Sequence, residues 1–340
     1  MKTVGILGAG QLAQLLAHAA YSLGLKTLCY SDQADAPAAR MSQMFVGSLE
    51  DEAALIAFAQ QVDVITLENE NIPDALLSLL QHHVNVFPGK AALSTSQDRW
   101  IEKSTFKQLG ITVPVFSDIT SAADIEVALK TLGCPAILKT RRFGYDGKGQ
   151  FRLHDPSQAE ETWQAIGQQP AIVESFVHFD QEVSQLAARN RQGDMVFYPL
   201  IHNHHEAGIL RTSTFPYDEP KLSALAQQHT RCIMEHLDYV GVMAFEFFVS
   251  GTTLLANEIA PRVHNSGHLT IEGTQCSQFA NHLRAIADLP LVTPRVVSAV
   301  RMENIIGTWP ETCHQQTGVY DYGKSPRPGR KLGHVIKDLT

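Results

Sequence analysis

Two acidic residues in neighbouring apolar segments are the strongest sign of chemistry in this sequence. The stretch GVMAFEFFVSGTTLLANEIAPR has two strand-like runs around a Gly-Thr turn, with Glu246 in the first run and Glu258 in the second. In a hairpin with a two-residue loop, Glu246 pairs with Asn257 and Glu258 points to the other face, because side chains alternate along a strand. A three-residue loop centred on Thr252 instead pairs the two carboxylates directly.

Opposed carboxylates repel each other and destabilise a hairpin. A divalent cation reverses the sign of that interaction, and carboxylate oxygens are ligands that suit Mg²⁺. We therefore predict an odd-length loop or a bulge that brings Glu246 and Glu258 to one face, where they hold Mg²⁺. The alternative is a solvated hairpin face with incidental acids, which the apolar residues around both acids disfavour.

A group of hydrogen-bond donors follows the second acid. The stretch IAPRVHNSGH contains Arg262, His264 and Asn265. A guanidinium presents a fixed fork of donors that suits carboxylates and phosphates. Beside the predicted metal, this group is expected to bind a small planar anion or a phosphoryl group in transfer. We expect His268 to be an ordinary hydrogen-bonded loop histidine.

Two glycine-rich turns compete for a nucleotide. The first, in VGILGAGQLAQLLAHAA, places Gly8, Gly10 and Ala13 at the spacing of a dinucleotide fingerprint, and Asp32 follows the next strand-like run. This pattern fits an NAD enzyme, but a tight strand-to-helix turn also needs glycine, and its free N–H groups can hold any phosphate. The second turn, KTRRFGYDGKGQ at 139–150, combines glycines with basic side chains after the apolar run PAIL.

Strand-like runs and segments of helical spacing alternate over the first ninety residues. The strands are expected at 2–8, 25–31, 62–68 and 84–89, and the helices at 11–23, 49–60 and 71–81. Such alternation predicts a parallel sheet with helices on both faces. We therefore expect residues 1–95 to form a Rossmann-like α/β domain.

The later part of the chain has a different, antiparallel character. A basic-polar helix at about 96–112 leads into a unit that extends to residue 170. The elements expected in that unit are a helix at 124–133 and strands at 135–140 and 150–154. An antiparallel sheet is expected over 171–295, with strands at 171–177, 182–190, 195–203, 240–250 and 253–261 and a long helix at 219–237. A Pro- and Gly-rich segment with the cluster KSPRPGRK ends the chain at 296–340.

Bulk properties exclude several classes of protein. The 340 residues are 44% hydrophobic and 18% charged, which is ordinary for a folded chain of two or three domains. A net charge of −8 argues against a general nucleic-acid binder. The five cysteines stand apart, without a CxxC pair, so a disulfide framework is not expected and a reducing cytoplasm fits best. Neither a signal peptide nor a membrane span is expected.

The motifs, taken in order, resemble the ATP-grasp superfamily and, within it, the N5-carboxyaminoimidazole ribonucleotide synthase family of purine biosynthesis. The resemblance covers nearly the whole chain, through GAGQLAQLL, ENEN, FGYDGKGQ, IVESFVHFDQEVS, FYPLIHNHHEAGILRTS, NEIAPRVHNSGH and RPGRKLGH. It implies a pre-ATP-grasp domain at 1–95, a linker helix and lid at 96–170 and a central ATP-grasp sheet at 171–295. The β-rich segment at 296–340 would then bind the substrate phosphate.

The resemblance also implies a role for each candidate residue. ATP would lie under the second glycine loop, against Arg99, Lys139, Gly144, Tyr145, Asp146, Gly147, Lys148, Gly149, Gln150, Glu174, Ser175, Phe176, Val177, Glu182, His205, Asn257 and Glu258. Within that set, 174–177 would be the adenine hinge and Glu182 would take the ribose hydroxyls. Mg²⁺ would be held by Glu246 and Glu258, with Asn257 beside them. Aminoimidazole ribonucleotide would contact Gly10, Gln11, Glu68, Glu70, Lys324, Arg330 and Lys331. The implied catalytic residues are Arg262, His264, Asn265, Tyr145 and Asp146.

The implied reaction is carboxylation of aminoimidazole ribonucleotide with ATP and bicarbonate. ATP would convert bicarbonate to carboxyphosphate, and Mg²⁺, Lys139 and the Arg262 group would offset charge on the phosphoryl group. Because that intermediate decomposes in water, the glycine loop is expected to close as a lid. The family also implies a cytoplasmic homodimer that acts on small molecules, without nucleic acid or membrane.

Two features depart from the family pattern. The family loop commonly reads GGYDGKGQ, whereas Phe143 precedes Gly144 here, and a phenylalanine would be strained if that position has positive φ. Related chains usually continue past the KLGH segment into a final helix, so this sequence is expected to be shortened after Thr340.

Three other readings stay open at this point. An NAD-dependent oxidoreductase would use the first turn but leaves the acidic hairpin and the basic tail unexplained. Another ATP-grasp ligase, such as a formate-using glycinamide ribonucleotide enzyme or a biotin carboxylase, would use the same motifs with a different acid or acceptor. A non-catalytic nucleotide sensor is disfavoured, because binding alone does not require both glutamates, Lys139 and Arg262.

Overall fold

A parallel sheet forms the first part of the chain, as predicted. This computed structural model describes residues 1–144, 149–311 and 317–339. The strands are β1 (Thr3–Leu7), β2 (Lys26–Ser31), β3 (Gln43–Val46), β4 (Val64–Leu67) and β5 (Val86–Phe87), in the order β3-β2-β1-β4-β5 with parallel pairing. The connecting helices are α1 (Gln11–Ser22), η1 (Pro37–Arg40), α2 (Glu52–Ala59) and α3 (Asp74–Gln81). This strand order is that of a Rossmann-like domain.

Alternating apolar side chains explain why helices cover both faces of this sheet. Ile6 on β1 packs in a core with Leu16 of α1, whereas the next residue, Leu7, packs in a core with Leu55 of α2 and Leu77 of α3. A strand buried on both faces is continuously apolar, which is the pattern of TVGIL and VITL. Because the strands are parallel, their carboxyl ends lie at one edge of the sheet, where the first glycine turn also lies.

Two short helices link this domain to the next. They are α4 (Lys90–Ser96) and α5 (Arg99–Gln108). The single helix expected at about 96–112 is therefore wrong in its bounds, and α4 was not predicted. The break has a local cause, because the Asp98 carboxylate accepts the N–H groups of Trp100 (3.0 Å) and Ile101 (3.4 Å) and so caps a new helix.

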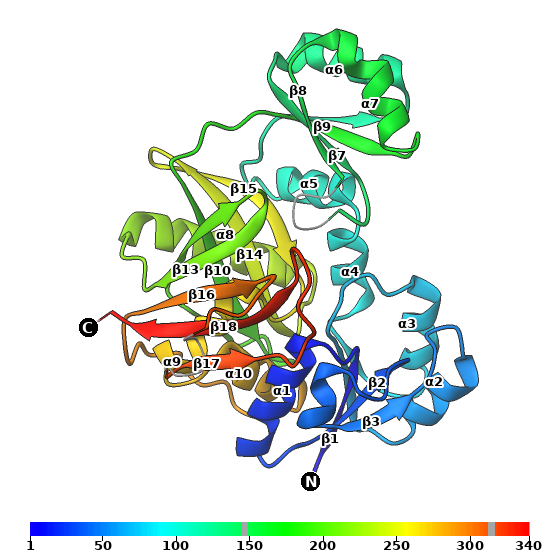
Figure 1. Ribbon diagram of the computed structural model, residues 1–340, viewed down its shortest axis with the longest axis vertical. Coiled ribbons are helices and arrows are strands. Elements are labelled where there is room, and N and C mark those ends of the chain that lie inside the picture. The colour runs from blue at the N-terminus through cyan, green and yellow to red at the C-terminus, as the bar shows by residue number, and fades with distance from the viewer. Residues whose placement is uncertain (145–148, 312–316, 340) are drawn as a thin grey trace.

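A small antiparallel sheet lies at the top of Figure 1, in the segment predicted to be the lid. Its strands β6 (Phe116–Ile119), β7 (Ala136–Thr140), β8 (Gln150–Leu153) and β9 (Ala171–Ser175) pair in the order β6-β9-β7-β8. Its helices are α6 (Ala122–Leu132), η2 (Pro156–Gln158) and α7 (Ala159–Ala165). The second glycine loop joins β7 to β8, whose Lys139 and Gln150 are paired. The loop therefore begins and ends at the same end of the β7–β8 hairpin.

A larger antiparallel sheet forms the centre of the molecule. Its strands are β10 (Gln181–Arg189), β11 (Met195–Phe197), β12 (Ile201–Glu206), β13 (Ile209–Phe215), β14 (Gly241–Ser250), β15 (Thr253–Ala260), β16 (Val300–Ile306), β17 (Val319–Asp321) and β18 (Lys331–Asp338). The order is β15-β14-β10-β12-β13-β16-β18-β17, with β11 paired to β10. The strand expected at 195–203 is wrong, because it is divided between β11 and β12 at Pro199, which has no N–H to donate to a ladder. The C-terminal strands extend this same sheet.

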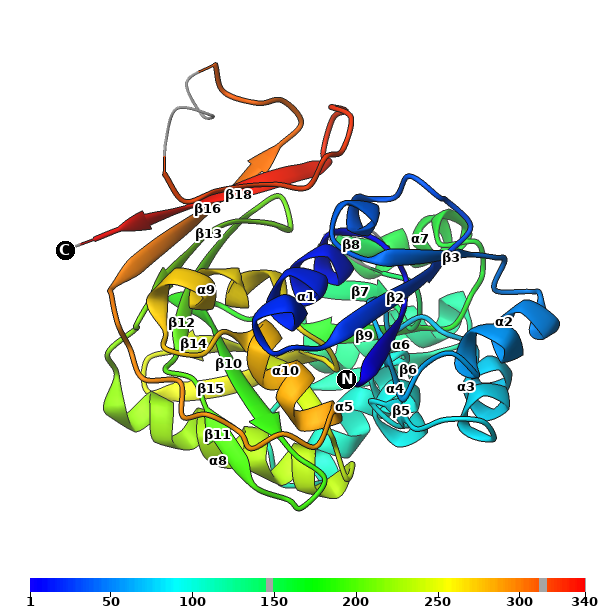
Figure 2. The same cartoon turned by 90° about the horizontal axis from the view of Figure 1, so that it is seen from below.

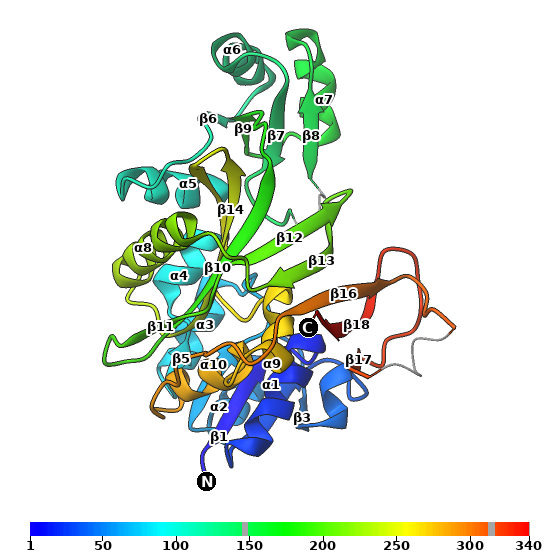
Figure 3. The ribbon, with the colours of Figure 1, turned by 90° about the vertical axis from the view of Figure 1, so that its left-hand side faces the viewer.

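Helices cover both faces of the central sheet. On one face lies α8 (Pro220–His236), and on the other lie η3 (Asn265–Leu269), α9 (Thr270–Gly273) and α10 (Gln278–Ile286) (Figures 2 and 3). α10 also contacts the N-terminal domain, since His282 lies 2.7 Å from Thr66 Oγ1 on β4 and accepts the Val242 N–H at 3.0 Å. No helix within the described residues is long and apolar enough to cross a membrane.

Candidate active site

The two hairpin acids face each other directly. The β14–β15 loop holds two residues, since Ser250 pairs with Thr253, but the register shifts so that Glu246 pairs with Glu258. Asn257 is the extra residue of the resulting bulge. The prediction of both acids on one face is confirmed, and a bulge rather than an odd-length loop achieves it.

Electrostatics around this pair favour a cation. Burial and the nearby Glu258 raise the pKa of Glu246 to about 7, so the pair resists carrying two negative charges. Arg99 Nη2 lies 3.4 Å from Glu258 and contributes one positive charge. Among the described residues, no group of three His, Cys, Asp or Glu side chains converges on a metal position. Two carboxylates alone suit Mg²⁺, which usually keeps waters and also binds substrate phosphates.

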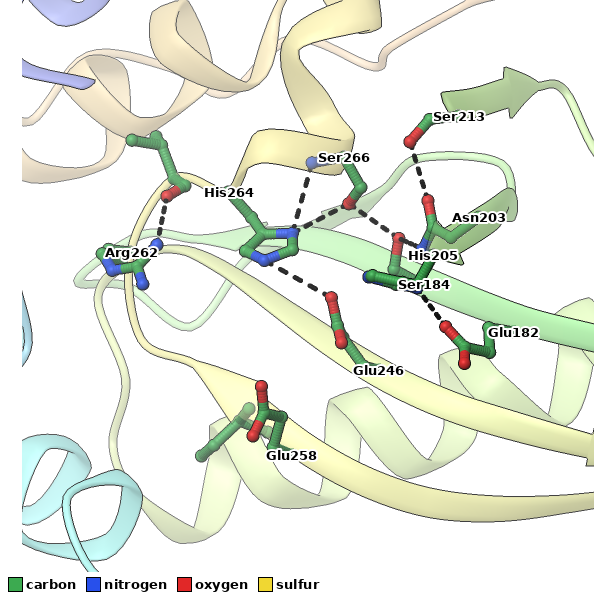
Figure 4. Close-up of polar contacts among 12 residues, drawn as sticks. Glu182, Ser184, Asn203, His205, Ser213, Glu246, Glu258, Arg262, His264 and Ser266 are labelled. Carbon is green, nitrogen blue, oxygen red and sulfur yellow. Dashed lines mark hydrogen bonds and ion pairs between the residues drawn. The ribbon is translucent and has the colours of Figure 1, made fainter. Parts of the chain in front are cut away.

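His264 links the acids to the donor group behind them (Figure 4). Its Nε2 lies 3.4 Å from a Glu246 oxygen. Its Nδ1 accepts the Ser266 N–H at 3.3 Å and lies 2.9 Å from Ser266 Oγ. Burial and the neighbouring Arg262 hold the pKa of His264 well below its usual value, so its imidazole is neutral at pH 7. A neutral ring whose Nδ1 accepts hydrogen bonds carries its proton on Nε2, facing Glu246.

Arg262 has a carboxylate partner within the protein, whereas the Asn265 side chain has no hydrogen-bond partner among the described residues. The Arg262 guanidinium binds both carboxylate oxygens of Glu70, with Nη2 3.0 Å from Oε1. Glu70 therefore anchors the arginine from the N-terminal domain. By contrast, neither polar atom of the Asn265 side chain has a hydrogen-bond partner among the described residues, although the residue is only 8% exposed. A buried amide without partners indicates a place for a polar ligand.

The first glycine turn is filled by the chain's own carboxylate. Glu68 follows β4 and accepts the N–H groups of Gly10 (2.6 Å) and Leu12 (3.1 Å) at the start of α1. A Cβ at Gly10 would lie 2.3 Å from Glu68 Oε1, so this glycine is needed for the close approach. Burial raises the pKa of Glu68, while the Gly10 N–H opposes that rise. These donors are thus not available to a pyrophosphate, which counts against the NAD reading.

The basic tail meets this turn. Lys324 Nζ donates to Gln11 Oε1 at 2.7 Å. Burial lowers the pKa of Lys324 to about 8, and the neighbouring Arg330, Lys331 and Arg327 lower it as well, against the opposing effect of Glu68. A concentration of cations at a site that already contains Glu68 and Glu70 is typical of a subsite for a phosphate-bearing ligand.

One cleft of about 1460 Å³ brings most of these residues together. The predicted site residues along its walls are Gln11, Glu68, Glu70, Arg99, Gly144, Glu258, Arg262, His264, Asn265, Lys324, Arg330 and Lys331. Gly10 lies beside Gln11 in the turn. Asp32, at the end of β2, also lines the cleft. The N-terminal domain, the hairpin and the tail therefore share one solvent-filled space.

The predicted ATP residues lie on the lid side. Lys139 on β7 forms an ion pair with Glu174 on β9 at 2.7 Å, and Lys103 on α5 contacts the other Glu174 oxygen at 3.1 Å. Burial alone would raise the pKa of Glu174, but the two lysines lower it to about 2. The Glu174 side chain is thus committed to holding Lys139. Backbone groups of 174–177 are what the adenine hinge would offer.

The remaining predicted ATP residues lie around this pair. Glu182 on β10 forms an ion pair with His205 on β12, and this contact and the nearby Glu246 raise the pKa of His205 against the effect of burial. Ser175 ends β9 and Phe176 and Val177 follow it, and the Arg152 guanidinium lies 4.3 Å above the Phe176 ring. Gly149 and Gln150 end the second loop. The predicted residues Tyr145, Asp146, Gly147 and Lys148 lie outside the described residues.

Phe143 adopts the conformation anticipated from its departure from the family pattern. Its φ is +62°, and its side chain is 69% exposed beside the cleft. Positive φ is costly for a residue with a Cβ, so strain is stored at the start of the second loop.

Two functional candidates were missed in the sequence. Glu102 lines the cleft and accepts the Ile259 N–H at 2.8 Å, and burial and Glu258 raise its pKa to about 8. Lys103 pairs with Glu174. The spacing of Arg99 and Lys103, four residues apart on one helix, was a usable signal because such residues share a face.

Comparisons with known proteins place the chain among characterised relatives. Family models match in three stretches: the ribonucleotide synthetase preATP-grasp domain at 1–97, the ATP-grasp domain at 104–279 and the phosphoribosylaminoimidazole carboxylase C-terminal domain at 301–337. The N5-carboxyaminoimidazole ribonucleotide synthase of Pseudomonas aeruginosa is 44% identical over 98% of this chain and 93% of its own length.

Solved structures agree with this relationship. N5-carboxyaminoimidazole ribonucleotide synthetase from Thermus thermophilus is 43% identical, with a TM-score of 0.94 over 98% of this chain and 93% of that one. N5-carboxyaminoimidazole synthase from Aspergillus clavatus, in complex with ADP and 5-aminoimidazole ribonucleotide, is 27% identical, with a TM-score of 0.91 over 99% of this chain and 94% of that one.

Proposed function

The chain belongs to the N5-carboxyaminoimidazole ribonucleotide synthase family of ATP-grasp ligases, and we propose that the cleft described above is where it performs its reaction. The enzyme is a carbon–nitrogen ligase of purine biosynthesis that uses ATP and bicarbonate to carboxylate 5-aminoimidazole ribonucleotide. The observation that carries the assignment to this cleft is its shared lining by the first glycine turn, the hairpin acid Glu258, the Arg262 group and the basic tail.

We assign the acceptor nucleotide to the end of the cleft between the first turn and the tail. Lys324, Arg330 and Lys331 are the cations suited to its phosphate, and Gln11 stands beside them. The Glu68 carboxylate already accepts the N–H groups of Gly10 and Leu12. We therefore propose that side chains, rather than the helix terminus, hold the phosphate. Glu70, fixed by Arg262, places an acceptor oxygen near the base-binding side.

We assign ATP to the space between the lid and the central sheet. Lys139, fixed by Glu174, presents its charge to the phosphates, and Arg99 reaches the same region from α5. Glu182 is suited to the ribose hydroxyls, and the backbone of 174–177 to adenine. The second glycine loop, hung from β7 and β8, closes over the phosphates and excludes water from the activated acid.

The opposed carboxylates fit a magnesium site. Glu246 and Glu258 supply hard oxygen ligands on one face, and the Asn257 bulge is what turns both toward it. A bound Mg²⁺ would neutralise the charge that develops on the transferring phosphoryl group. The chain's own contribution is to hold the two carboxylates on one face of the hairpin, with Arg99 beside Glu258.

His264 and Asn265 are the residues proposed to bind bicarbonate. Bicarbonate is a poor electrophile, so its activation as carboxyphosphate precedes attack by the weakly nucleophilic amine. Asn265, with both polar atoms free of partners among the described residues, and His264, which lines the cleft beside it, are the groups placed to orient it. Asp146 is proposed to orient the amine or accept its proton.

ADP release tests this function directly. Purified enzyme with Mg·ATP and bicarbonate is assayed with and without 5-aminoimidazole ribonucleotide. Strong stimulation by the nucleotide, lost when bicarbonate is removed, is the expected result. Stimulation by glycinamide ribonucleotide with formate would instead identify another ATP-grasp ligase, and strong thermal protection by NAD without protection by ATP would support the oxidoreductase.

The last part of the proposal concerns the cellular location and the oligomeric state of the enzyme. We propose a cytoplasmic homodimer, in line with free thiols at Cys29 and Cys276 and with an exposed hollow of about 480 Å³ on the N-terminal domain. Tyr21 and Met41, which are 89% and 52% exposed, line that hollow. Light scattering should give twice the chain mass, and Tyr21→Glu should reduce it if this surface forms the dimer.

A further inference from the structure

A line of polar side chains runs through the otherwise apolar core of the central sheet. Ser184 lies on β10, Asn203 on β12, Ser213 on β13 and Ser266 on η3, and each is at most 4% exposed. Around them the core is apolar, with Leu186, Ile201, Phe215, Ala244 and Leu269 among its members. Apolar residues would fill this space at lower cost, because a buried polar group must find partners.

The sheet register places this line on the face that carries the active-site acids. Ser184 pairs directly with Glu246 on β14, which in turn pairs with Glu258. Asn203 pairs with Glu182 on one side and Ser213 on the other. Directly paired side chains point to the same face of a sheet. The polar side chains and the acids therefore lie next to each other on one face of the central sheet.

Hydrogen bonds join the line into an uninterrupted chain that ends at His264 (Figure 4). The Ser213 hydroxyl donates to Asn203 Oδ1 at 2.8 Å, and Asn203 Nδ2 donates to Ser184 Oγ at 3.1 Å. Ser184 Oγ and Ser266 Oγ are 2.8 Å apart, and Ser266 Oγ is 2.9 Å from His264 Nδ1.

The donor-to-acceptor direction of these hydrogen bonds follows from where each hydroxyl proton can go. Each serine hydroxyl has one proton to donate. Once Ser184 Oγ accepts from Asn203, Ser266 Oγ is the partner within the described residues that remains for the Ser184 proton, so Ser184 donates to Ser266 and the Ser266 proton is left for His264 Nδ1. The Ser266 backbone N–H also points at Nδ1, at 3.3 Å.

If the Asn203 amide were reversed, the chain would run the other way, and Ser266 Oγ would no longer donate to the ring. Nδ1 would still accept the Ser266 N–H, which excludes a proton on that nitrogen. The backbone thus selects the tautomer, and the side-chain line supplies the second donor that fixes the ring's orientation.

We propose that Ser213, Asn203, Ser184 and Ser266 form a positioning network, which fixes the orientation of the His264 ring so that its Nε2–H is directed at Glu246. The proposal rests on the proposed function only in that Glu246 and His264 are taken to face the reacting groups. None of these four residues lines the cleft, so they act through His264. The network explains why hydrophilic side chains occupy the apolar core.

Ser184→Ala is the decisive variant, because it removes the middle of the chain without a large change in volume. We expect kcat to fall by roughly 10- to 100-fold while KM for ATP stays within about twofold, as is typical when a supporting hydrogen bond is lost. Thr230→Val is the matched control, since it also removes a fully buried hydroxyl, one that donates to Ala226 O on α8, outside the network. Thr230→Val should keep the wild-type kcat.

Nitrogen NMR of histidine-labelled enzyme supplies a readout that packing alone would not move. The His264 signals are identified by their loss in His264→Asn. Wild type should show an unprotonated Nδ1 and a protonated Nε2, and Ser184→Ala should shift the Nδ1 resonance, whereas Thr230→Val should not. If Ser184→Ala does not fold, Ser213→Ala tests the far end of the chain in the same way.

Three results would overturn the proposal: a proton on Nδ1 of His264 in wild type, an unchanged kcat with unchanged His264 resonances in folded Ser184→Ala, or an equal loss of kcat in Thr230→Val. Failure of the proposed function would look different. Wild type would then release no ADP in response to aminoimidazole ribonucleotide, while the His264 resonances would still report on the network.

Discussion

Single residues at the hairpin decide whether a cation can sit there. Glu258 faces Glu246 across a bulge, and the burial of Glu246 keeps the repulsion between the two carboxylates strong. For Glu258→Gln, we expect ADP release to fall by at least about 100-fold, because one ligand and half of the stabilising charge are lost. The measurement is steady-state ADP release across a Mg²⁺ titration. Removing one of two like charges should leave the melting temperature unchanged or slightly higher.

Glu235→Gln, an exposed change on α8, is the control and should behave as wild type. Near-normal turnover of Glu258→Gln with the same Mg²⁺ dependence would remove Glu258 from the metal site.

Two glycines that begin helices allow a second comparison at this scale. Gly10 precedes α1 and Gly89 precedes α4, with φ of −80° and −77°. A Cβ at Gly10 would meet Glu68 at 2.3 Å, whereas at Gly89 nothing lies within 4 Å. Gly10→Ala should therefore lower the free energy of unfolding by about 1–3 kcal/mol more than Gly89→Ala, since the overpacking is present only at the first site. Urea denaturation of both variants measures this difference.

The Gly10 variant should also bind aminoimidazole ribonucleotide less tightly, because Glu68 must move away from the turn. Equal destabilisation of the two variants would mean that the Glu68 contact does not constrain the turn.

At the scale of elements, Lys103 holds three of them together. It lies on α5, contacts Glu174 on β9 and donates to the Ala256 carbonyl on β15 at 3.1 Å. Lys103→Met should lower the free energy of unfolding by about 1–3 kcal/mol, because Glu174 keeps Lys139 but one of its buried oxygens and the Ala256 carbonyl lose their donor. Lys107→Met lies one turn further on the same helix, where the side chain is exposed, and should cost less than about 0.5 kcal/mol.

Urea unfolding of the Lys103 and Lys107 variants is the measurement. A loss at Lys103 no larger than that at Lys107 would show that Lys139 alone satisfies Glu174.

The elements also show how far the sequence could predict this molecule. The parallel domain was predictable because alternating apolar runs and helical spacing extend over many residues. Glu246 and Glu258 were predictable as a pair, because the hairpin pattern left few registers and a shared cation favours the register that pairs the two acids. Short elements such as β3 and α4 carry too few residues for a period to stand out.

Other features depend on contacts between distant segments, which no local pattern contains. The Glu174–Lys103 pair requires the lid and α5 to be docked, and Glu68 reaches Gly10 only because β4 lies beside β1. The Ser184 line depends on the register of several strands. By contrast, the division of the 195–203 strand at Pro199 was visible in the sequence and was missed.

At the scale of the whole molecule, buried histidines couple the fold to pH. Burial lowers the pKa of His282 to about 4 from an ordinary value of 6.5. The unfolded chain therefore binds a proton at His282 below pH 6.5 that the folded chain refuses until about pH 4, so stability falls as the pH falls through this window. The structural cause is that Nδ1 accepts the Val242 N–H and cannot also carry a proton.

His282→Gln should flatten this dependence. We expect the slope of unfolding free energy against pH between about 6 and 4.5 to decrease by up to about 1.4 kcal/mol per pH unit relative to wild type. Urea denaturation at several pH values measures the slope. His83→Gln, an exposed change, should leave the slope as it is. A wild-type slope in His282→Gln would mean that the residue is already protonated in the folded state.

The contact between Gln11 and Lys324 joins positions 313 residues apart. A ribosome that adds about 5–20 residues per second synthesises the tail roughly 15–60 s after the first turn. Lys139, Glu174 and both hairpin acids are synthesised within that interval, before the cations of the acceptor end. The residues proposed to bind ATP are thus made first, and the tail proposed to bind the acceptor is made last, so the acceptor end of the cleft is completed only when synthesis is nearly finished.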